Sequence, residues 1–345
     1  MARRRTRLLR STPADVRVAA EILRVGGLVA FPTETVYGLG ANALDARAVR
    51  GIFEAKARPA DDPVIVHIAQ ISQLEAIARP TDEALRLAER FWPGPLTLVL
   101  PKQAVVPVEV TAGLESVGVR IPSHPVAQAL LAAADLPIAA PSANLFGRPS
   151  PTRASHVVHD LEGRIDAVVD GGATQLGLES TIIDLSSPTP RLLRPGGLAA
   201  EAVEDVLGAQ LQASSAATRG PQPAPGMLPV HYSPRTPLVL IRGASAADRL
   251  VREVAASLRN GKRVGVVALG EDLARLPADV RVERVGAWSM PEASAARLFD
   301  ALRALDTAGL DVLYVRELAD PSRGLGRALD DRLRRASRQV LDTES

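Results

Sequence analysis

Two cations stand close together in the stretch from Phe31 to His67, which carries the residues best suited to chemistry. Lys56 and Arg58 lie at the end of a predicted helix and precede a proline. The alternative to a functional role is that they only complement the helix dipole. The stretch opens with a hydroxyl-rich turn, Pro32-Thr-Glu-Thr35, and closes near a lone histidine in an apolar strand. We expect these groups to line a pocket for a phosphorylated substrate and a carboxylate-bearing one.

A second polar pair and an isolated arginine follow further along the chain. Ser142 and Asn144 lie in a Pro-framed loop, where a hydroxyl and an amide can face one ligand or form a simple turn. Arg120 lies within the apolar segment 117–121. Because a buried arginine needs an anionic partner, it predicts either a substrate carboxylate or an internal salt bridge.

Further hydroxyls and one more arginine come at predicted strand ends, at Ser180 and Arg194, where open α/β sheets bind ligands. The combined inventory holds cations, hydroxyls and one histidine, with no obvious acidic dyad and no activated nucleophile. It suits positioning and charge neutralisation around phosphates, which is most of what phosphoryl or nucleotidyl transfer asks of a protein.

Two other patterns are poorer matches to known sites. The segment Gly38-Leu-Gly-Ala-Asn-Ala43 fits the spacing of a dinucleotide fingerprint, but that fingerprint needs its first glycine directly after a strand, and PTETVY intervenes. His156 and His159 could hold a metal, but without a third ligand nearby they are more typical of a helix surface.

The composition limits the class of protein. A chain of 345 residues with 46% hydrophobic residues predicts two globular domains. The absence of cysteine excludes disulfides, thiolate metal sites and a cysteine nucleophile, and it fits a cytoplasmic protein. The net charge of +2 is not that of a nucleic-acid-binding protein. The basic run MARRRTRLLR is interpreted as a solvated tail with a possible weak RNA contact, and no apolar stretch is long enough to span a bilayer.

Alternating elements predict an α/β fold in both halves. In the first half, strands are expected at 28–31, 64–68, 96–100, 117–121, 137–140, 167–170, 180–185 and 191–194, and helices at 13–25, 45–57, 82–91, 125–134, 153–161 and 199–207. In the second, strands are expected at 238–241, 263–269, 280–285 and 310–315, and helices at 245–259, 292–305 and after 323. A Pro-, Ala- and Ser-rich linker separates them, giving domains at 1–212 and 237–345 with the linker at 213–236.

The motifs taken together resemble the Sua5/YciO/YrdC family. They occur in the family order as PTETVYGLG, KARP followed by PVIVHI, WPGPLTLVL, VGVRIPSHP, APSANLFGRPSPT, GLESTIIDL and LLRPGG. The segments PGMLPVHYSP and GLGRALDDRLRRAS resemble the longer, two-domain Sua5 branch. The resemblance therefore covers nearly the whole chain. It implies a twisted, open, mixed YrdC-like sheet with a concave basic cleft, followed by a smaller Rossmann-like α/β domain.

The resemblance also implies an activity. Such enzymes join L-threonine, bicarbonate or CO2, and ATP into threonylcarbamoyl-AMP and release pyrophosphate, with Mg²⁺ accompanying ATP. The product supplies a downstream tRNA threonylcarbamoyl transferase complex that modifies adenosine 37 of tRNAs reading ANN codons.

The family's functional positions map onto this chain as three sets, of which the catalytic set and the ATP set overlap. The resemblance implies catalytic roles for Lys56, Arg58, Ser142 and Asn144. It implies ATP contacts for Lys56, Arg58, Ser116, Ser142, Ser150, Arg194, His231 and Tyr232, the last two on a linker that docks over the active site. It implies L-threonine contacts for Thr33, His67, Arg120, Ala140 and Ser180. No metal ligand can be named.

Three other functions remain open from the sequence. A non-catalytic module could bind tRNA or double-stranded RNA through the same basic surface, and would do so in a salt-sensitive way. A nicotinamide-dependent enzyme would use the glycine-rich segment. A carbamoyl transferase of hydrogenase maturation shares this domain type, but the zinc-finger segments expected there need cysteines that this chain lacks.

Overall fold

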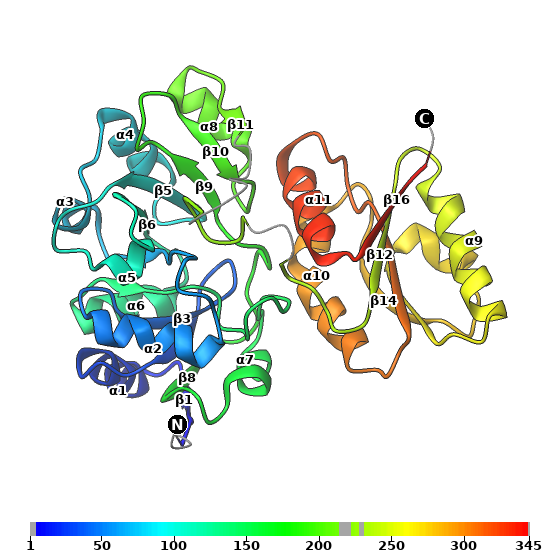
Figure 1. Ribbon diagram of the computed structural model, residues 1–345, viewed down its shortest axis with the longest axis horizontal. Coiled ribbons are helices and arrows are strands. Elements are labelled where there is room, and N and C mark those ends of the chain that lie inside the picture. The colour runs from blue at the N-terminus through cyan, green and yellow to red at the C-terminus, as the bar shows by residue number, and fades with distance from the viewer. Residues whose placement is uncertain (1–4, 214–221, 228–230, 344–345) are drawn as a thin grey trace. The chain divides into compact units, whose positions relative to one another are not determined.

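The computed structural model describes residues 5–213, 222–227 and 231–343. The chain forms two compact units, each of which is treated by itself (Figure 1). The first holds residues 1–146, 150–175 and 179–228, and the second holds 147–149, 176–178 and 229–345. Two short segments of the N-terminal half are thus assigned to the second unit.

The first unit is built on one mixed sheet. Its described strands lie in the order β1-β8-β2-β3-β7-β4-β6-β5-β9-β10-β11, with parallel pairs such as β5 and β9 next to antiparallel pairs such as β5 and β6. The strands are β1 (Arg7–Arg10), β2 (Val29–Pro32), β3 (Tyr37–Asn42), β4 (Val66–His67), β5 (Leu96–Pro101), β6 (Ser116–Arg120), β7 (Ile138–Ala139), β8 (Ala167–Asp170), β9 (Thr181–Asp184), β10 (Arg191–Arg194) and β11 (Gln212–Ala213). The predicted mixed α/β sheet is confirmed.

Helices cover both faces of this sheet, because its strands are apolar on both sides. Along β2, Val29 and Phe31 enter one core with α1 and α6, while Leu28 and Ala30 enter a second core with α2 and α7. The helices are α1 (Pro13–Arg24), α2 (Ala46–Lys56), α3 (Leu74–Ile77), α4 (Asp82–Phe91), α5 (Val108–Thr111), α6 (Pro125–Ala134), α7 (Ala154–Leu161) and α8 (Ala200–Leu207), with a 3-10 turn, η1 (Ile71–Gln73).

Helix α2 begins and ends at residues whose chemistry suits those positions. The Asp45 side chain accepts hydrogen bonds from the backbone N–H groups of Arg47 and Ala48, which satisfies two otherwise unpaired donors. The helix stops at Ala57, which takes the left-handed conformation with a φ of 52°. This end fixes the direction in which Lys56 and Arg58 leave the helix.

The glycine-rich segment forms strand β3, which the sequence prediction missed. Gly38 and Gly40 pair with Phe31 and Val29 of β2 in an antiparallel hairpin. A Cβ on Gly40 would stand 2.9 Å from side-chain atoms of both Phe31 and Ile138, so these strands can meet only if that residue lacks a side chain. The glycines thus serve packing within a strand, and the segment opens no phosphate-binding helix.

The basic N-terminal run is not a solvated tail throughout. Residues 1–4 lie outside the described part of the chain, but Arg7–Arg10 form the edge strand β1, which pairs in parallel with β8. Leu9 is buried while Leu8 is 65% exposed, as the alternation of a strand requires. The prediction was wrong here because the arginines on both sides of Leu8 and Leu9 hide the alternation of exposed and buried residues that marks a strand.

The second unit contains a smaller, all-parallel sheet in the order β14-β13-β15-β12-β16. This confirms the predicted Rossmann-like α/β unit, with β16 as an edge strand that was not predicted. The strands are β12 (Leu238–Arg242), β13 (Val264–Leu269), β14 (Arg281–Gly286), β15 (Val312–Arg316) and β16 (Gln339–Asp342); the helices are α9 (Ala246–Arg259), α10 (Pro291–Asp306) and α11 (Gly324–Ala336), with a 3-10 segment, η2 (Gly270–Arg275).

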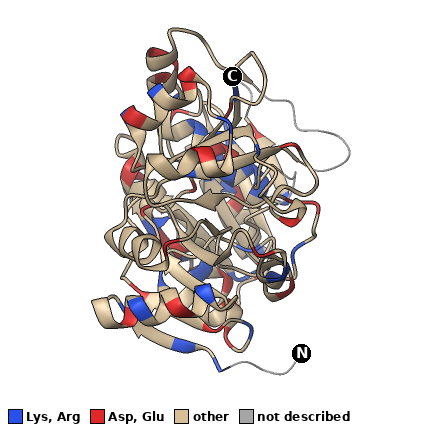
Figure 2. Ribbon diagram, turned by 90° about the vertical axis from the view of Figure 1, so that its left-hand side faces the viewer, with Lys and Arg blue, Asp and Glu red and all other residues tan. Residues whose placement is uncertain are grey.

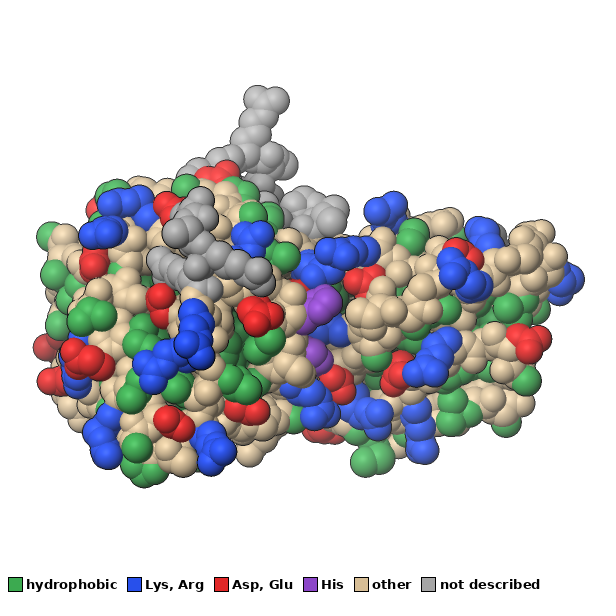
Figure 3. Space-filling model, turned by 90° about the horizontal axis from the view of Figure 1, so that it is seen from below, with side chains coloured by type: hydrophobic (Ala, Val, Ile, Leu, Met, Phe, Trp, Pro, Cys, Tyr) green, Lys and Arg blue, Asp and Glu red, His purple; other side chains and the backbone are tan. Residues whose placement is uncertain are grey.

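Charged residues of both signs occur along the ribbon (Figure 2). On the face shown in Figure 3, basic and acidic side chains are interspersed with hydrophobic and other side chains. This agrees with 41 basic against 39 acidic residues in the sequence. Among the described residues, no helix is both long and apolar enough to cross a membrane.

Replacing Gly40 by alanine should lower the free energy of unfolding by about 1–3 kcal/mol, because the new methyl group overpacks the contact with Phe31 and Ile138. The matched change Gly51→Ala in α2, where the nearest atom lies 3.6 Å away, should instead stabilise by about 0.5–1 kcal/mol. Urea unfolding of both variants measures this, and equal effects would contradict the packing role of Gly40.

Candidate active site

Lys56 is the link between helix α2 and the loop that carries Ser142 and Asn144. Its side chain is 1% exposed, and its Nζ donates to the carbonyl oxygens of Ser142 at 2.5 Å and Asn144 at 2.7 Å. The Asn144 Oδ1 atom lies 3.5 Å from the same nitrogen. The Lys-x-Arg and Ser-x-Asn pairs, 86 residues apart in sequence, therefore meet in one place.

Arg58 is held by the backbone of the loop that follows it. Its Nη2 donates to the carbonyl oxygens of Asp62 at 3.1 Å and Pro63 at 2.7 Å, and its Nε donates to the Asp62 carbonyl at 3.3 Å. The same Nη2 lies 2.9 Å from the Asp62 carboxylate as a buried ion pair. The guanidinium is therefore fixed by the segment of chain that directly follows it.

Three cations surround the carboxylate of Asp62. Burial raises the pKa of Asp62, and the charges of Arg58, Lys56 and Arg194 act in the opposite direction. Arg194 comes from β10, far along the chain, so the fold gathers cations from separate elements at one point. Such a cluster attracts phosphate groups.

Arg194 also binds backbone on two sides. Its Nε and Nη2 donate to the carbonyl oxygen of Ser180 at 3.2 and 3.0 Å, and Nη1 donates to the carbonyl of Pro225 at 3.0 Å. The Ser180 hydroxyl lies 2.8 Å from that of Thr97 and accepts from Arg194 Nη2 at 3.2 Å. Thr97 had not been predicted to belong to the site.

The described part of the linker packs on this unit. Ala224 and Met227 are buried in a small apolar cluster with side chains of the sheet: Ile65, Val99, Ile182 and Leu193. Residues 223–225, together with Ser116, line a small cavity of about 10 Å³. Because Pro225 also accepts from Arg194, residues 222–227 form part of the site's surroundings. The predicted linker residues 214–221 and 228–230 lie outside the described residues.

Arg120 forms an internal salt bridge, which was one of the two interactions predicted for it. Its Nη2 donates to Glu34 at 2.6 Å and its Nη1 donates to the Thr35 hydroxyl at 3.1 Å, all buried. The Thr35 hydroxyl in turn lies 2.7 Å from that of Thr33. The other Glu34 oxygen accepts from the backbone N–H of Ser123 at 3.1 Å. The prediction that Arg120 holds a substrate carboxylate stays a prediction.

His67 lies beside Arg120, on the neighbouring parallel strand. Burial, together with the positive charge of Arg120, lowers the pKa of His67 to about 3. Its imidazole is therefore neutral at physiological pH and can donate or accept a hydrogen bond without adding charge. Ala140 is close by, directly after β7: its N–H donates to the carbonyl of Ile65 at 2.8 Å, and the same carbonyl oxygen lies 3.3 Å from His67 Nδ1.

Two further predicted residues have different surroundings. The Ser150 hydroxyl donates to the buried carboxylate of Glu179 at 2.5 Å in the first unit. His231 and Tyr232 belong to the second unit, where the Tyr232 ring packs against Phe299 and under the guanidinium of Arg332. Their predicted role at ATP is not tested by these contacts.

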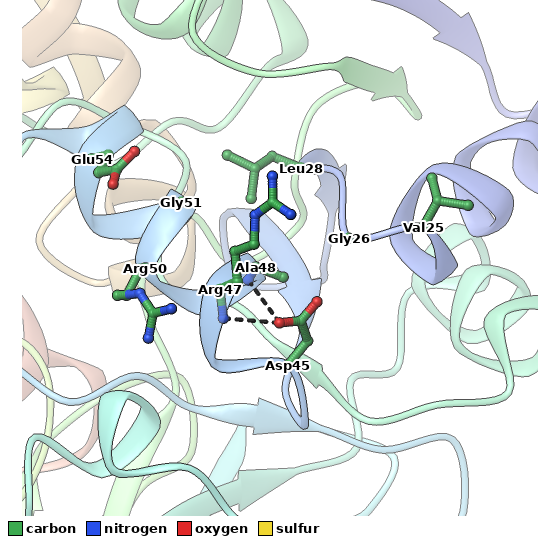
Figure 4. Close-up of a pocket in the computed structure, with 9 residues that line it drawn as sticks. All are labelled: Val25, Gly26, Leu28, Asp45, Arg47, Ala48, Arg50, Gly51 and Glu54. Carbon is green, nitrogen blue, oxygen red and sulfur yellow. Dashed lines mark hydrogen bonds between the residues drawn. The ribbon is translucent and has the colours of Figure 1, made fainter. Parts of the chain in front are cut away.

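A separate surface hollow of about 310 Å³ lies between α2 and the segment 25–28 that follows α1 (Figure 4). It is lined by residues including Arg47, Arg50 and Glu54, and by the helix-capping Asp45. None of the predicted site residues lines it. Among the described residues, no group of three or more His, Cys, Asp and Glu is arranged to hold a metal ion, so the pair His156 and His159 forms no such centre.

The sequence prediction overlooked the carboxylates of this region. Glu34, Asp62 and Glu179 are buried next to Arg120, Arg58 and Ser150 respectively. Glu34 was visible within the PTET motif, and Asp62 stands four residues after Arg58, a spacing that allows an ion pair. Nothing in the sequence signals that Glu179 meets Ser150.

Comparison with known proteins identifies the family. Residues 21–196 match the family model Sua5_yciO_yrdC, described as "Telomere recombination", and residues 198–338 match the model Sua5_C, described as "Threonylcarbamoyl-AMP synthase, C-terminal domain". The chain belongs to the Sua5/YciO/YrdC family. With both models matched, it is of the two-domain Sua5 type, as the motifs had predicted.

Relatives of this Sua5-type chain match it over nearly their whole length. The threonylcarbamoyl-AMP synthase of Pyrococcus abyssi is 48% identical, covering 93% of this chain and 94% of that protein. The enzyme of the same name from Bacillus subtilis is 46% identical, covering 95% and 94% respectively. The prediction that this Sua5-type chain is an enzyme, a nucleotidyltransferase, is confirmed.

A solved structure of P. abyssi Sua5 in complex with L-threonine has the same fold. It matches with a TM-score of 0.91 and 44% identity, covering 98% of this Sua5-type chain and 99% of that one.

Protonation of His67 should destabilise the protein at low pH. Because its pKa falls from 6.5 to about 3 on folding, the unfolded chain binds the proton more tightly, and stability is lost as pH falls below 6.5. The loss should approach about 1.4 kcal/mol per pH unit. Urea unfolding at pH values from about 7.5 to about 5 should show a smaller loss in His67→Gln. The exposed His159→Gln serves as control, and an equal slope in all three proteins would contradict this.

Proposed function

We propose that this protein is an L-threonylcarbamoyladenylate synthase. It would convert L-threonine, bicarbonate or CO2, and ATP into threonylcarbamoyl-AMP and pyrophosphate. The full-length relatives that carry this name support the proposal most directly. The cluster of Lys56, Arg58 and Arg194 supports it from the chain itself, because it supplies the positive charge that a polyphosphate needs.

The chemistry proceeds in two steps. The amine of L-threonine adds to CO2 and loses a proton, giving a carbamate. A carbamate oxygen then attacks the α-phosphorus of ATP, the bond to the β-phosphate oxygen breaks, and pyrophosphate leaves. The protein's task is positioning and charge neutralisation, since neither step needs a covalent enzyme intermediate. The cations would offset the charge that moves onto pyrophosphate, and Ser142, Asn144 and Ser150 would hold the nucleotide in line.

The buried polar chain around Arg120 would receive L-threonine. Thr33, Thr35 and His67 offer hydroxyls and a neutral imidazole close to that guanidinium. Sites that hydrogen-bond a substrate hydroxyl reject analogues that lack it, because buried polar groups are then left unpaired. The position of Ser180, between Thr97 and Arg194, suits a residue shared by the amino acid and nucleotide regions.

Mg²⁺ would arrive with ATP as part of the substrate. The described residues offer no set of carboxylates for a resident ion: Glu34 is engaged by Arg120 and Ser123, and Asp62 by Arg58. Mg²⁺ keeps several waters and binds phosphate oxygens readily, so the polyphosphate and water supply its coordination.

The linker would exclude water from the product, which is a mixed anhydride that water can hydrolyse. Residues 222–227 pack on the sheet and accept a hydrogen bond from Arg194, and in our proposal they form part of this closure. The product would pass to a tRNA threonylcarbamoyl transferase complex in the cytoplasm and be used at adenosine 37 of tRNA.

A non-catalytic RNA-binding module is the alternative function. The formal net charge of +2 does not favour it, because non-specific RNA binding draws on an excess of positive charge. It predicts salt-sensitive tRNA binding with no dependence on L-threonine.

Purified protein should release pyrophosphate from ATP and Mg²⁺ only when both L-threonine and bicarbonate are present. Lys56→Ala should reduce this release by about a hundredfold or more. The change removes one cation from the cluster of Lys56, Arg58 and Arg194, and it removes the hydrogen-bond donor that fixes the 142–144 loop. A coupled pyrophosphate assay measures the rate.

The exposed Lys262→Ala of the second unit is the matched control and should keep the full rate. Folded wild-type protein that releases no pyrophosphate in response to L-threonine would contradict the synthase proposal, and salt-dependent tRNA binding would then be measured.

A further inference from the structure

Asp62 is a carboxylate buried at the centre of the cation cluster. It is 2% exposed, and its Oδ2 lies 2.9 Å from Arg58 Nη2. Neither carboxylate oxygen accepts a hydrogen bond from a described residue, because the N–H groups of Arg58 are directed at the carbonyl oxygens of Asp62 and Pro63. Its contact with Arg58 is thus an ion pair without an aligned hydrogen bond.

A bare, buried anion at this position conflicts with the binding of a polyphosphate. A carboxylate deprived of water and of hydrogen bonds is costly unless cations compensate for it. Here the compensating charges are Arg58, Lys56 and Arg194, which are also those proposed to bind ATP. When phosphates claim these cations, Asp62 loses its compensation and gains negative neighbours, so its ionised form becomes much less favourable.

We propose that Asp62 is the internal counter-ion of the cation cluster formed by Lys56, Arg58 and Arg194, and that it takes up one proton when ATP binds to these cations. In the ATP-free protein its negative charge neutralises the cation cluster and keeps Arg58 in place. When the triphosphate replaces it as the partner of these cations, the carboxylate takes a proton from solvent and becomes a neutral carboxyl group. The proposal rests on the proposed function, in that it takes ATP as the ligand of Arg58.

The groups that face Asp62 explain why ATP binding would favour its protonated form. Arg58 and Lys56, from the end of α2, and Arg194, from β10, favour the ionised form while ATP is absent. Asp61, next in the chain, and burial favour the protonated form, and burial is the largest of these influences, raising the pKa of Asp62. The carboxylate is therefore poised so that a change in its cationic partners alters its protonation.

The coupling has a definite sign. Because the ATP-bound protein binds one proton more than the free protein, the affinity for ATP should rise as pH falls, by up to about tenfold per pH unit within the responsive window. Asp62→Asn has the same shape and no titratable group, so its ATP affinity should lack this contribution. It should also bind ATP more tightly than wild type at alkaline pH, where the wild type must take up a scarce proton.

Isothermal titration calorimetry with ATP and Mg²⁺, without L-threonine, tests this at about pH 6.5 to about 8.5. Titrations in buffers of different ionisation enthalpy count the protons taken up, and the ionisation of ATP itself cancels between variants. We expect wild type to take up close to one proton more than Asp62→Asn at the pH of largest difference. The exposed neighbour Asp61→Asn removes a charge that raises the pKa of Asp62, so this variant should keep the proton uptake and move it to lower pH.

The outcomes separate this inference from the proposed function. Equal proton counts in wild type and Asp62→Asn, both binding ATP, would overturn the counter-ion role and leave the synthase proposal intact. Wild-type protein that is folded but binds no ATP would overturn both. If thermal unfolding shows that Asp62→Asn is unstable, the proton uptake on ATP binding is compared between wild type and Asp61→Asn over the same pH range. The absence of proton uptake in wild type would contradict the proposal.

Discussion

The buried ammonium group of Lys56 is the interaction on which the rest of the site depends. It joins the end of α2 to the loop after β7 by donating to the carbonyl oxygens of Ser142 and Asn144. A buried lysine is tolerated only when its donors are satisfied and nearby anions offset its charge. Both conditions hold here, through two backbone carbonyls and through Asp62. Helix, loop and cation cluster are therefore fixed by the same group.

The first unit contains two buried polar centres with different electrical character. Around Asp62, three cations face one carboxylate, so the net charge is positive and suits a polyphosphate. Around Arg120, one guanidinium faces Glu34, and hydroxyls and a neutral imidazole surround the pair. This second centre is balanced, and it offers hydrogen bonds in place of charge. In the proposed function, the first centre would serve the nucleotide and the second would serve the amino acid.

The described part of the linker, residues 222–227, is more than a tether. Ala224 and Met227 are buried against the sheet, and the carbonyl of Pro225 accepts from Arg194. A proline-framed segment loses little conformational entropy when it docks, because its backbone is already restricted. Because Pro225 binds Arg194, the packing of this segment helps to position one member of the cation cluster.

The sequence by itself determined most elements and the identity of the cluster's cations. Helices such as α4 and α6 were predicted with their observed bounds, because apolar periodicity and capping residues are local signals. Lys56, Arg58, Ser142 and Asn144 were found from type and spacing. Strand β3 was missed because its glycines read locally as a loop, and β1 because arginines mask its alternation. Tertiary structure alone decided that Glu34 pairs with Arg120 and that Arg194 joins Arg58 near Asp62, because these residues are far apart in sequence and no local pattern connects them.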